Sequence, residues 1–272
     1  MKTMIHKCAR MLVASCLIAF SCVALNAASL GEVVSYEKSG NSLVVVSKNG
    51  KQVITPYSNE IVKVAVAEAV AEKPSKSVVM PSVRVKYDVI DADGKLVIAM
   101  RNGNEVVVDK ATSAVSFKRG KKTLLEESAG IAKQGKERVI SFKSAAEESF
   151  YGCGERGVSY DLKGDTMVMF NKQNYAYGKG DRTSQMNITV PFYISSLGYG
   201  VYFDDYTASK LILKDPVEYV TECKTPVSYY FIGSEKGDIA GVVKNYTELT
   251  GRQELAPFWA LGYITSKYGY RT

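Results

Sequence analysis

The chain has 272 residues, of which 46% are hydrophobic and 23% are charged, and its formal net charge is +7. This composition is typical of one folded globular protein and excludes the disordered, collagenous and polytopic membrane classes. The basic residues are scattered along the chain without a block or stripe, which argues against nucleic acid as a partner.

Residues 1–28 resemble a secretory signal peptide. Three basic residues precede a 15-residue apolar stretch from Met11 to Leu25, and the small residues Ala27 and Ala28 follow it. An apolar stretch of this length is short for a membrane span, which needs about 20 residues. We therefore expect cleavage and export to the periplasm or the extracellular space. A retained anchor helix and a lipid anchor at Cys22, whose preceding residues make a poor lipobox, are the alternatives.

Cleavage near residue 28 would change the chemistry open to the mature chain. It removes His6, which is the single histidine, together with three of the five cysteines. A mature chain without histidine has no Ser-His-Asp or Cys-His catalysis and no His-ligated zinc site. Cys153 and Cys223 remain, and their spacing leaves open whether they pair or stay as thiols.

Short alternating or β-branched runs fill the first half of the mature chain. The predicted strands are 43–47, 52–55, 61–66, 83–90, 96–100, 106–109, 114–118 and 139–142. Dipeptides that tolerate positive φ in tight hairpins lie between them: Asn49-Gly50, Asp93-Gly94, Asn102-Gly103 and Arg119-Gly120. This spacing predicts a β-sandwich with an exposed excursion over residues 68–77, where Pro74 interrupts the strand pattern.

Beyond residue 149 the strands continue, and the composition shifts towards glycine and tyrosine, which fits loops that approach a ligand closely. Residues 152–157 match the string G-x-G-x-x-G, but no apolar helix follows, so a glycine-rich bend is favoured over a dinucleotide site. Two pairs of adjacent acids, Glu147-Glu148 and Asp204-Asp205, would point to opposite faces of a strand. We expect these acids to be solvated or turn-forming and not a catalytic pair.

One segment near the end of the chain has helical periodicity. Apolar residues recur at helical spacing between a polar start at Ser234 and a glycine stop at Gly251: Ile239, Val242, Val243, Tyr246 and Leu249. Pro257 then ends the connection, and residues 259–263 are predicted to form a new apolar strand.

Seven short motifs in the second half of the chain follow one another in a characteristic order. They are 150–155, 170–173, 190–195, 198–204, 229–232, 246–252 and 259–263, the last leading into 266–271. This order resembles the region that precedes the catalytic barrel in glycoside hydrolase family 31. Weaker similarity at 60–64, 116–120 and 124–126 extends the resemblance over nearly the whole mature chain.

The resemblance implies a mainly β fold. It consists of an antiparallel, galactose-mutarotase-like β-sandwich over 29–257 with one C-terminal helix, then the first strand of a truncated (β/α)8 barrel over 258–272. In this family the barrel carries an aspartate nucleophile and an aspartate acid/base for retaining cleavage of α-glycosides. A whole barrel takes on the order of 250 residues, so we expect neither aspartate in this chain. The chain would then be the N-terminal piece of a longer enzyme, or the product of an interrupted gene, and inactive alone.

The resemblance also implies four substrate-binding residues. Tyr268 matches the tyrosine at the end of the first barrel strand, which lines the pocket for the non-reducing sugar. Asn171, Lys172 and Gln173 match a sandwich loop that reaches over the barrel mouth. Many family members have an aspartate where Gln173 stands, so this contact to the next sugar is uncharged here. Barrel core for Tyr268 and an ordinary surface hairpin for the loop are the alternatives.

We therefore expect part of an exported α-glucosidase-like enzyme that acts on α-linked oligosaccharides, with the missing catalytic barrel as its partner and with no metal or organic cofactor. An oligosaccharide α-glucosyltransferase or an α-xylosidase of the same family is the alternative within this class. A non-catalytic carbohydrate-binding or scaffold module is the alternative from another class. Residues 259–263 suit a strand buried on both faces, so without a partner they should form an exposed apolar tail.

Overall fold

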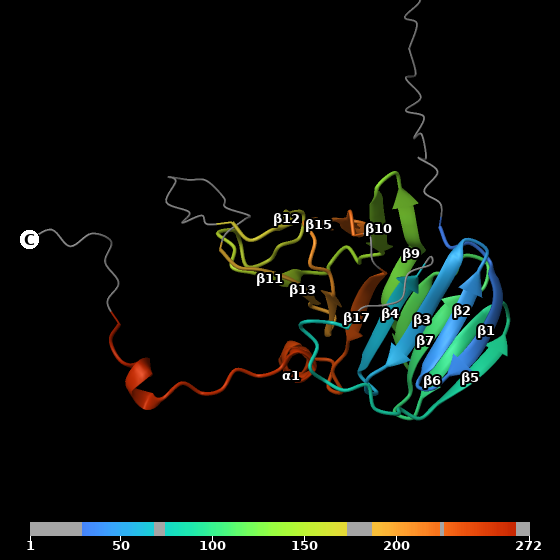
Figure 1. The fold of residues 1–272 in the computed structure, drawn as a ribbon, viewed down its shortest axis with the longest axis horizontal. Coiled ribbons are helices and arrows are strands. Elements are labelled where there is room, and N and C mark those ends of the chain that lie inside the picture. The colour runs from blue at the N-terminus through green and yellow to red at the C-terminus, as the bar shows by residue number, and fades with distance from the viewer. Residues whose placement is uncertain (1–28, 68–73, 173–186, 224–225, 265–272) are drawn as a thin grey trace, which may run out of the picture.

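The computed structural model describes residues 29–67, 74–172, 187–223 and 226–264. These residues form two antiparallel sheets that lie face to face (Figure 1). The first sheet has eight strands, in the order β1 (Val33–Ser39), β2 (Ser42–Ser47), β3 (Gly50–Pro56), β4 (Ile61–Ala67), β17 (Val227–Ile232), β14 (Tyr199–Phe203), β13 (Thr189–Ser195) and β11 (Phe150–Gly154).

The second sheet has nine strands. Their order is β12 (Thr166–Met169), β15 (Ser209–Leu213), β16 (Val217–Thr221), β10 (Glu137–Phe142), β9 (Lys122–Gln134), β8 (Val115–Arg119), β7 (Asn104–Asp109), β6 (Lys95–Met100) and β5 (Tyr87–Ala92). The predicted antiparallel β-sandwich is confirmed, and every strand predicted between residues 43 and 142 has a counterpart. The largest shift is at β5, which begins four residues later than expected.

Tight hairpins connect neighbouring strands at all four places where the sequence predicts them. Positive φ angles occur in three of the four predicted dipeptides, at Asp93 (52°), Gly94 (72°), Gly103 (83°) and Gly120 (57°). At Asn49-Gly50 the hairpin is present but neither residue has a positive φ, and Gly50 already pairs with Ser47 as the first residue of β3. The two turn residues are therefore Lys48 and Asn49.

Aromatic rings from the two sheets meet in the core between them. Phe203 of β14 stacks on Tyr219 of β16 with 3.9 Å between ring centroids. Phe117 of β8 stacks on Phe231 of β17 at 4.3 Å. All four rings are buried, so large aromatic side chains from both sheets hold the sandwich together.

The predicted helix is present as α1 (Ile239–Thr250) and ends before Gly251. Asp238 caps its N-terminus, because its carboxylate accepts a hydrogen bond from the backbone N–H of Gly241 at 3.0 Å. The helix packs on the outer face of the eight-stranded sheet, where Tyr246 stacks on Phe192 of β13 at 4.0 Å. Ile239 and Val243, which the periodicity also assigned to the apolar face, remain partly exposed at the edge of this contact.

A long connection leads from the eight-stranded sheet to the nine-stranded sheet. Residues 68–73 of the predicted excursion lie outside the described residues, and residues 74–86 have no helix or strand. This segment crosses the outer face beside α1, where the N–H groups of Val79 and Met80 both approach the carbonyl of Leu249, at 3.0 and 3.2 Å. It therefore covers the side of the sheet that carries the helix.

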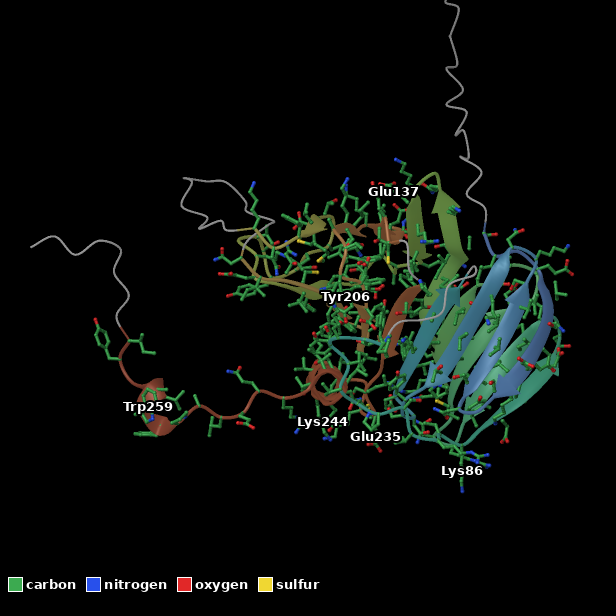
Figure 2. All side chains as sticks on the ribbon, in the orientation of Figure 1. Lys86, Glu137, Tyr206, Glu235, Lys244 and Trp259 are labelled. Carbon is green, nitrogen blue, oxygen red and sulfur yellow. The ribbon has the colours of Figure 1, made fainter. Side chains whose placement is uncertain are left out.

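The end of the described chain differs from the prediction. Residues 258–272 were expected to begin a barrel strand, but Phe258–Leu261 forms a short 3₁₀ helix, and residues 265–272 lie outside the described part. A barrel strand takes its hydrogen bonds from neighbouring strands, and no described strand lies beside this segment. Its apolar side chains are exposed, as predicted for the unpartnered segment, with Trp259 82% exposed (Figure 2).

No helix in the described part of the chain combines the length and the apolar character that crossing a membrane requires. The predicted signal peptide lies outside the described residues.

Candidate functional site

The structure describes two of the four predicted substrate-binding residues. Asn171 and Lys172 come two and three residues after the end of β12 and are exposed, whereas Gln173 and Tyr268 lie outside the described residues. The side-chain oxygen of Asn171 accepts hydrogen bonds from Thr189 at the start of β13, from the backbone N–H at 2.7 Å and from the hydroxyl at 2.8 Å. Asn171 therefore joins two strands that belong to different sheets.

Asn171 lines a cleft of about 370 Å³, which we call the Tyr206 cleft. Two aromatic side chains that remain largely exposed line it as well, Phe170 at 53% and Tyr206 at 56%. The other lining residues are Ser77, Met169, Thr189, Pro191, Tyr202, Asp205, Thr207 and Ala208. The cleft thus combines aromatic surface with hydroxyl and amide groups, the mixture usual in small-molecule sites.

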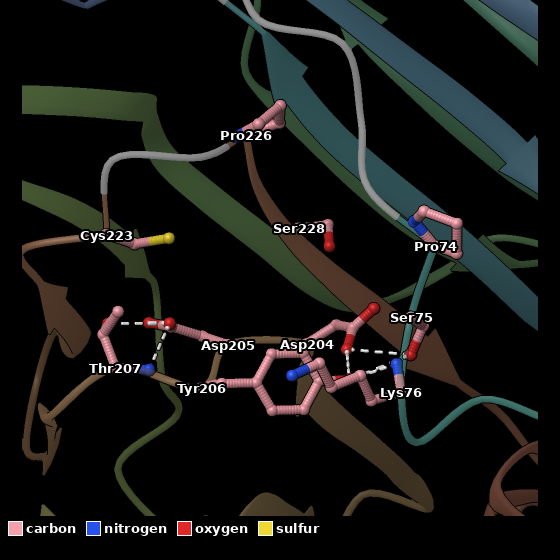
Figure 3. A pocket seen from close by; sticks show the side chains of 10 residues that line it. All are labelled: Pro74, Ser75, Lys76, Asp204, Asp205, Tyr206, Thr207, Cys223, Pro226 and Ser228. Carbon is pink, nitrogen blue, oxygen red and sulfur yellow. Dashed lines mark hydrogen bonds between the residues drawn. The ribbon is translucent and has the colours of Figure 1, made fainter.

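A second cleft of about 250 Å³ lies next to the first and shares Asp205, Tyr206 and Thr207 with it (Figure 3). The Tyr206 hydroxyl donates to Asp204 Oδ1 at 2.9 Å and accepts from the backbone N–H groups of Lys76, at 2.6 Å, and Ser77, at 3.1 Å. Tyr206 therefore holds the connection before β5 against the loop that follows β14.

Asp205 fixes this loop from the inside. Its Oδ1 accepts from the backbone N–H of Thr207 at 2.9 Å and from the Thr207 hydroxyl at 2.7 Å. Its Oδ2 accepts from the hydroxyls of Tyr219, at 3.0 Å, and Thr221, at 2.5 Å. Four hydrogen bonds occupy both carboxylate oxygens, so Asp205 positions the residues around it and has no oxygen left for chemistry of its own.

Neither acid pair lies within a strand, and Asp205 forms a turn with Thr207, which agrees with the expected turn-forming role. The expectation of solvation is wrong for Glu148 and Asp205, which are both buried. Glu148 accepts hydrogen bonds from the backbone N–H of Ala145 and from the hydroxyls of Ser195 and Tyr199. The two hydroxyl donors come from positions about 50 residues away in the sequence, so a local pattern does not reveal them.

A third buried acid, Glu127, lies between the sheets. It accepts from the Tyr229 hydroxyl at 2.6 Å and from the backbone N–H of Val115 at 2.9 Å. Burial raises its pKa to about 7, although both hydrogen bonds act in the opposite direction. Glu127 lies in the core and lines neither of the two clefts, so it is a structural acid.

The glycine-rich string forms a bend, as predicted. Gly152, Cys153 and Gly154 all have positive φ, at 105°, 66° and 84°, where β11 breaks its register with β13. The backbones approach closely here, because a Cβ on Gly154 would lie 2.5 Å from the carbonyl oxygen of Ile188. The next element after the bend is the strand β12 and not a helix, which leaves the amides without the arrangement that holds a pyrophosphate.

Cys153 and Cys223 are both buried, and they do not form a disulfide with each other. Burial raises the pKa of the Cys153 thiol to about 12, which makes it a poor nucleophile. Among the described residues, no three His, Cys, Asp or Glu side chains gather as a metal site would require.

Together, the two large antiparallel sheets and the clefts at the ends of β12, β13 and β14 define a β-sandwich of the galactose mutarotase-like class. Residues 51–210 match the family described as the glycosyl hydrolase 31 N-terminal galactose mutarotase-like domain. The chain belongs to glycoside hydrolase family 31.

Relatives of known name agree with this assignment. The chain is 32% identical over 157 residues to an α-glucosidase of Saccharolobus solfataricus, a match that covers 55% of this chain and 22% of that protein. It is 28% identical over 226 residues to α-glucosidase 2 of Bacillus thermoamyloliquefaciens, which covers 79% of this chain and 28% of the relative. The chain thus spans about a quarter of the length of these relatives.

Solved structures share the fold. The Flavobacterium johnsoniae GH31 dextranase in complex with glucose superposes with a TM-score of 0.79 at 23% identity, over 87% of this chain and 30% of the dextranase. The sandwich is therefore the part that this chain has in common with a larger enzyme.

Proposed function

We propose that this chain is the N-terminal sandwich of an exported, retaining α-glycosidase that acts on α-linked oligosaccharides. The observation that carries the proposal is the family match over residues 51–210, together with relatives named α-glucosidases that are several times longer than the matched region. In this proposal the catalytic aspartates belong to a barrel outside these 272 residues.

Within such an enzyme the chain would supply one wall of the substrate site. Two hydrogen bonds anchor Asn171 to Thr189, which supports Asn171 as the start of the proposed sugar-binding loop. Lys172 and Gln173 follow it directly, and Tyr268 would contribute from the first barrel strand. The uncharged amide at Gln173 can both donate to and accept from sugar hydroxyls.

The exposed apolar tail supports the proposed partnership with a barrel. Phe258, Trp259 and Tyr263 expose most of their surfaces, and contiguous exposed apolar groups commonly mark a surface that another body covers. The barrel is the occupant that the family resemblance assigns to this position.

The test begins with the coding sequence downstream of codon 272. We expect a continuing or frameshifted open frame that encodes a barrel, and a product containing this chain and the barrel that hydrolyses p-nitrophenyl α-D-glucopyranoside. Proton NMR of the first product should show retention of the α configuration. A β-configured first product would contradict the retaining mechanism.

The same assay separates the alternatives. A clear preference for the α-xyloside would replace the α-glucosidase with an α-xylosidase. Predominant transfer to a second sugar, detected as longer oligosaccharides, would identify a glucosyltransferase. An unrelated gene directly downstream, together with no activity, would favour the non-catalytic carbohydrate-binding module.

A further inference from the structure

We propose that residues 29–32 form a strap that closes one end of the sandwich, and that the leader, residues 1–28, is cut off before this strap docks and no later in the chain than the Ala28–Ser29 bond. Removal of the leader rests on the export included in the proposed function. The position of the limit and the order of the two events rest on the contacts of the strap itself.

Hydrogen bonds to distant parts of the chain fix the strap, which contains no helix or strand. The Ser29 carbonyl accepts from Asn49 Nδ2 at 2.9 Å, and the Leu30 carbonyl accepts from the Asn49 backbone N–H at 3.0 Å. The Gly31 carbonyl accepts from the Ser113 hydroxyl at 2.5 Å. Consecutive carbonyls are thus held by groups outside the strap, which makes it a docked segment and not a loose end.

The strap joins the two sheets at this end of the sandwich. The Glu32 carbonyl accepts from the backbone N–H of Lys48, in the turn between β2 and β3 of the eight-stranded sheet, at 3.0 Å. The next residue, Val33, donates its N–H to the carbonyl of Lys110, which follows β7 of the nine-stranded sheet, at 2.8 Å. Docking of the strap therefore closes this end.

Burial sets the limit for the cut. Leu30 is 4% exposed and belongs to the main hydrophobic core. Ser113 is fully buried with φ at 62°, and its conformation is held because its hydroxyl also bonds to the Ser47 hydroxyl at 2.6 Å and its carbonyl accepts from Gln52 at 3.1 Å. A cut after Leu30 would remove this side chain from the core together with two of the strap's carbonyl contacts.

Docking of the strap and cutting of the Ala28–Ser29 bond exclude each other. A protease binds an extended, locally open chain, so the residues directly after the scissile bond must be free. In the docked strap, Asn49 holds the carbonyls of Ser29 and Leu30, and the Leu30 side chain is buried. Hydrolysis consumes one water and leaves a carboxylate on Ala28 and an ammonium group on Ser29. The cut therefore precedes docking, and the docked strap then protects the new N-terminus.

The test compares two fusions in which a flexible tail replaces residues 1–28 and ends in the recognition sequence of enteropeptidase, which cuts directly after that sequence. In the direct fusion the cut falls before Ser29. In the spaced fusion six Gly and Ser residues separate the cut from Ser29. We expect the folded direct fusion to be cut at least about tenfold more slowly than the spaced one, whereas short peptides with the same two junctions should be cut at equal rates.

Two variants loosen the strap without changing the residues next to the cut. Asn49→Ala removes the donor to the Ser29 carbonyl, and Ser113→Ala removes the donor to the third strap carbonyl. Each should speed cutting of the direct fusion at least about threefold and leave the spaced fusion unchanged. Asn49 is exposed, so its variant keeps the core intact. Lys48→Ala is the matched control and should leave both rates unchanged, because its side chain pairs with Glu32 at the surface, where both are more than half exposed.

Equal cutting rates for the two folded fusions would overturn the inference, and so would unchanged cutting of the direct fusion in Asn49→Ala and Ser113→Ala. N-terminal sequencing of the exported protein is the second test. We expect its first residue to be Ser29 or an earlier one, and a first residue of Leu30 or later would contradict the limit. The fusion experiment needs no export and no enzyme activity, so its outcome is separate from that of the proposed function, which is judged by hydrolysis in the product that carries a barrel.

Discussion

Replacement of the buried acid Glu127 gives the most quantitative prediction. Glu127 is 2% exposed, and it accepts hydrogen bonds from the Tyr229 hydroxyl and the Val115 backbone N–H. Its pKa is about 7 in the folded protein, compared with the ordinary value of 4.5. At 1.36 kcal/mol per unit, this difference corresponds to about 3 kcal/mol of stability.

The sign follows from proton binding. Between pH 4.5 and 7 the folded chain keeps the Glu127 proton and the unfolded chain loses it, so rising pH favours unfolding. The contribution of this group is therefore largest below pH 4.5, falls as the pH rises to 7, and stays low above that. Glu127→Gln has no proton to lose and should not show this decline.

The measurement is urea unfolding of both proteins from pH 4.5 to 8. The free energy of unfolding of Glu127→Gln minus that of the original chain should rise by about 3 kcal/mol across this range. Glu126→Gln is the control, because Glu126 is partly exposed and pairs with Lys143 at the surface, where ion pairs contribute little. Parallel pH curves for Glu127→Gln and the original chain would refute this account of the buried acid.

Three further predictions concern the bend, the loop and the tail. Gly154→Ala places a Cβ 2.5 Å from the Ile188 carbonyl oxygen. It should lower the free energy of unfolding by at least about 2 kcal/mol more than Gly164→Ala, because Gly164 has a similar φ but open space around it. Equal losses in urea unfolding would contradict the close approach. Asp205→Ala leaves the buried hydroxyls of Tyr219 and Thr221 without their acceptor and should lower the free energy of unfolding by about 3 kcal/mol in the same assay. A loss below about 1 kcal/mol would contradict the positioning role of Asp205. Trypsin or chymotrypsin should trim the chain towards residue 257. The melting temperature of the trimmed protein should equal that of the intact chain, because Phe258–Leu261 has no buried residue. Protease resistance at Trp259 would contradict an exposed tail.

Local patterns account for the part of the fold that the sequence predicts correctly. Strand alternation and turn dipeptides depend on nearby residues, so eight strands and all four hairpins follow from them. The helix is recognised for the same reason, because its polar start, apolar spacing and Gly251 stop are all local.

Features that depend on distant residues are missed. β1 is an exposed edge strand with little alternation, and β9 contains two adjacent buried leucines, Leu124 and Leu125, next to a register shift that breaks its period. Strand order is equally hidden, since β4 pairs with β17 from far along the chain.

The candidate site divides in the same way. The position of Asn171 follows from a family motif, and the structure places it in a cleft. Tyr206 joins residues 75–77 across about 130 positions of sequence, a contact that no local pattern reveals. The burial of Glu148 and Asp205 was missed because their hydrogen-bond donors are supplied mainly by other strands.

The most direct test of the central claim is an activity measurement on the purified 272-residue chain with p-nitrophenyl α-D-glucopyranoside, maltose and isomaltose. We predict no turnover above that of a buffer blank, because the catalytic acids of the proposed enzyme belong to the barrel. Reproducible hydrolysis of any of these α-glucosides by the chain alone would contradict the account.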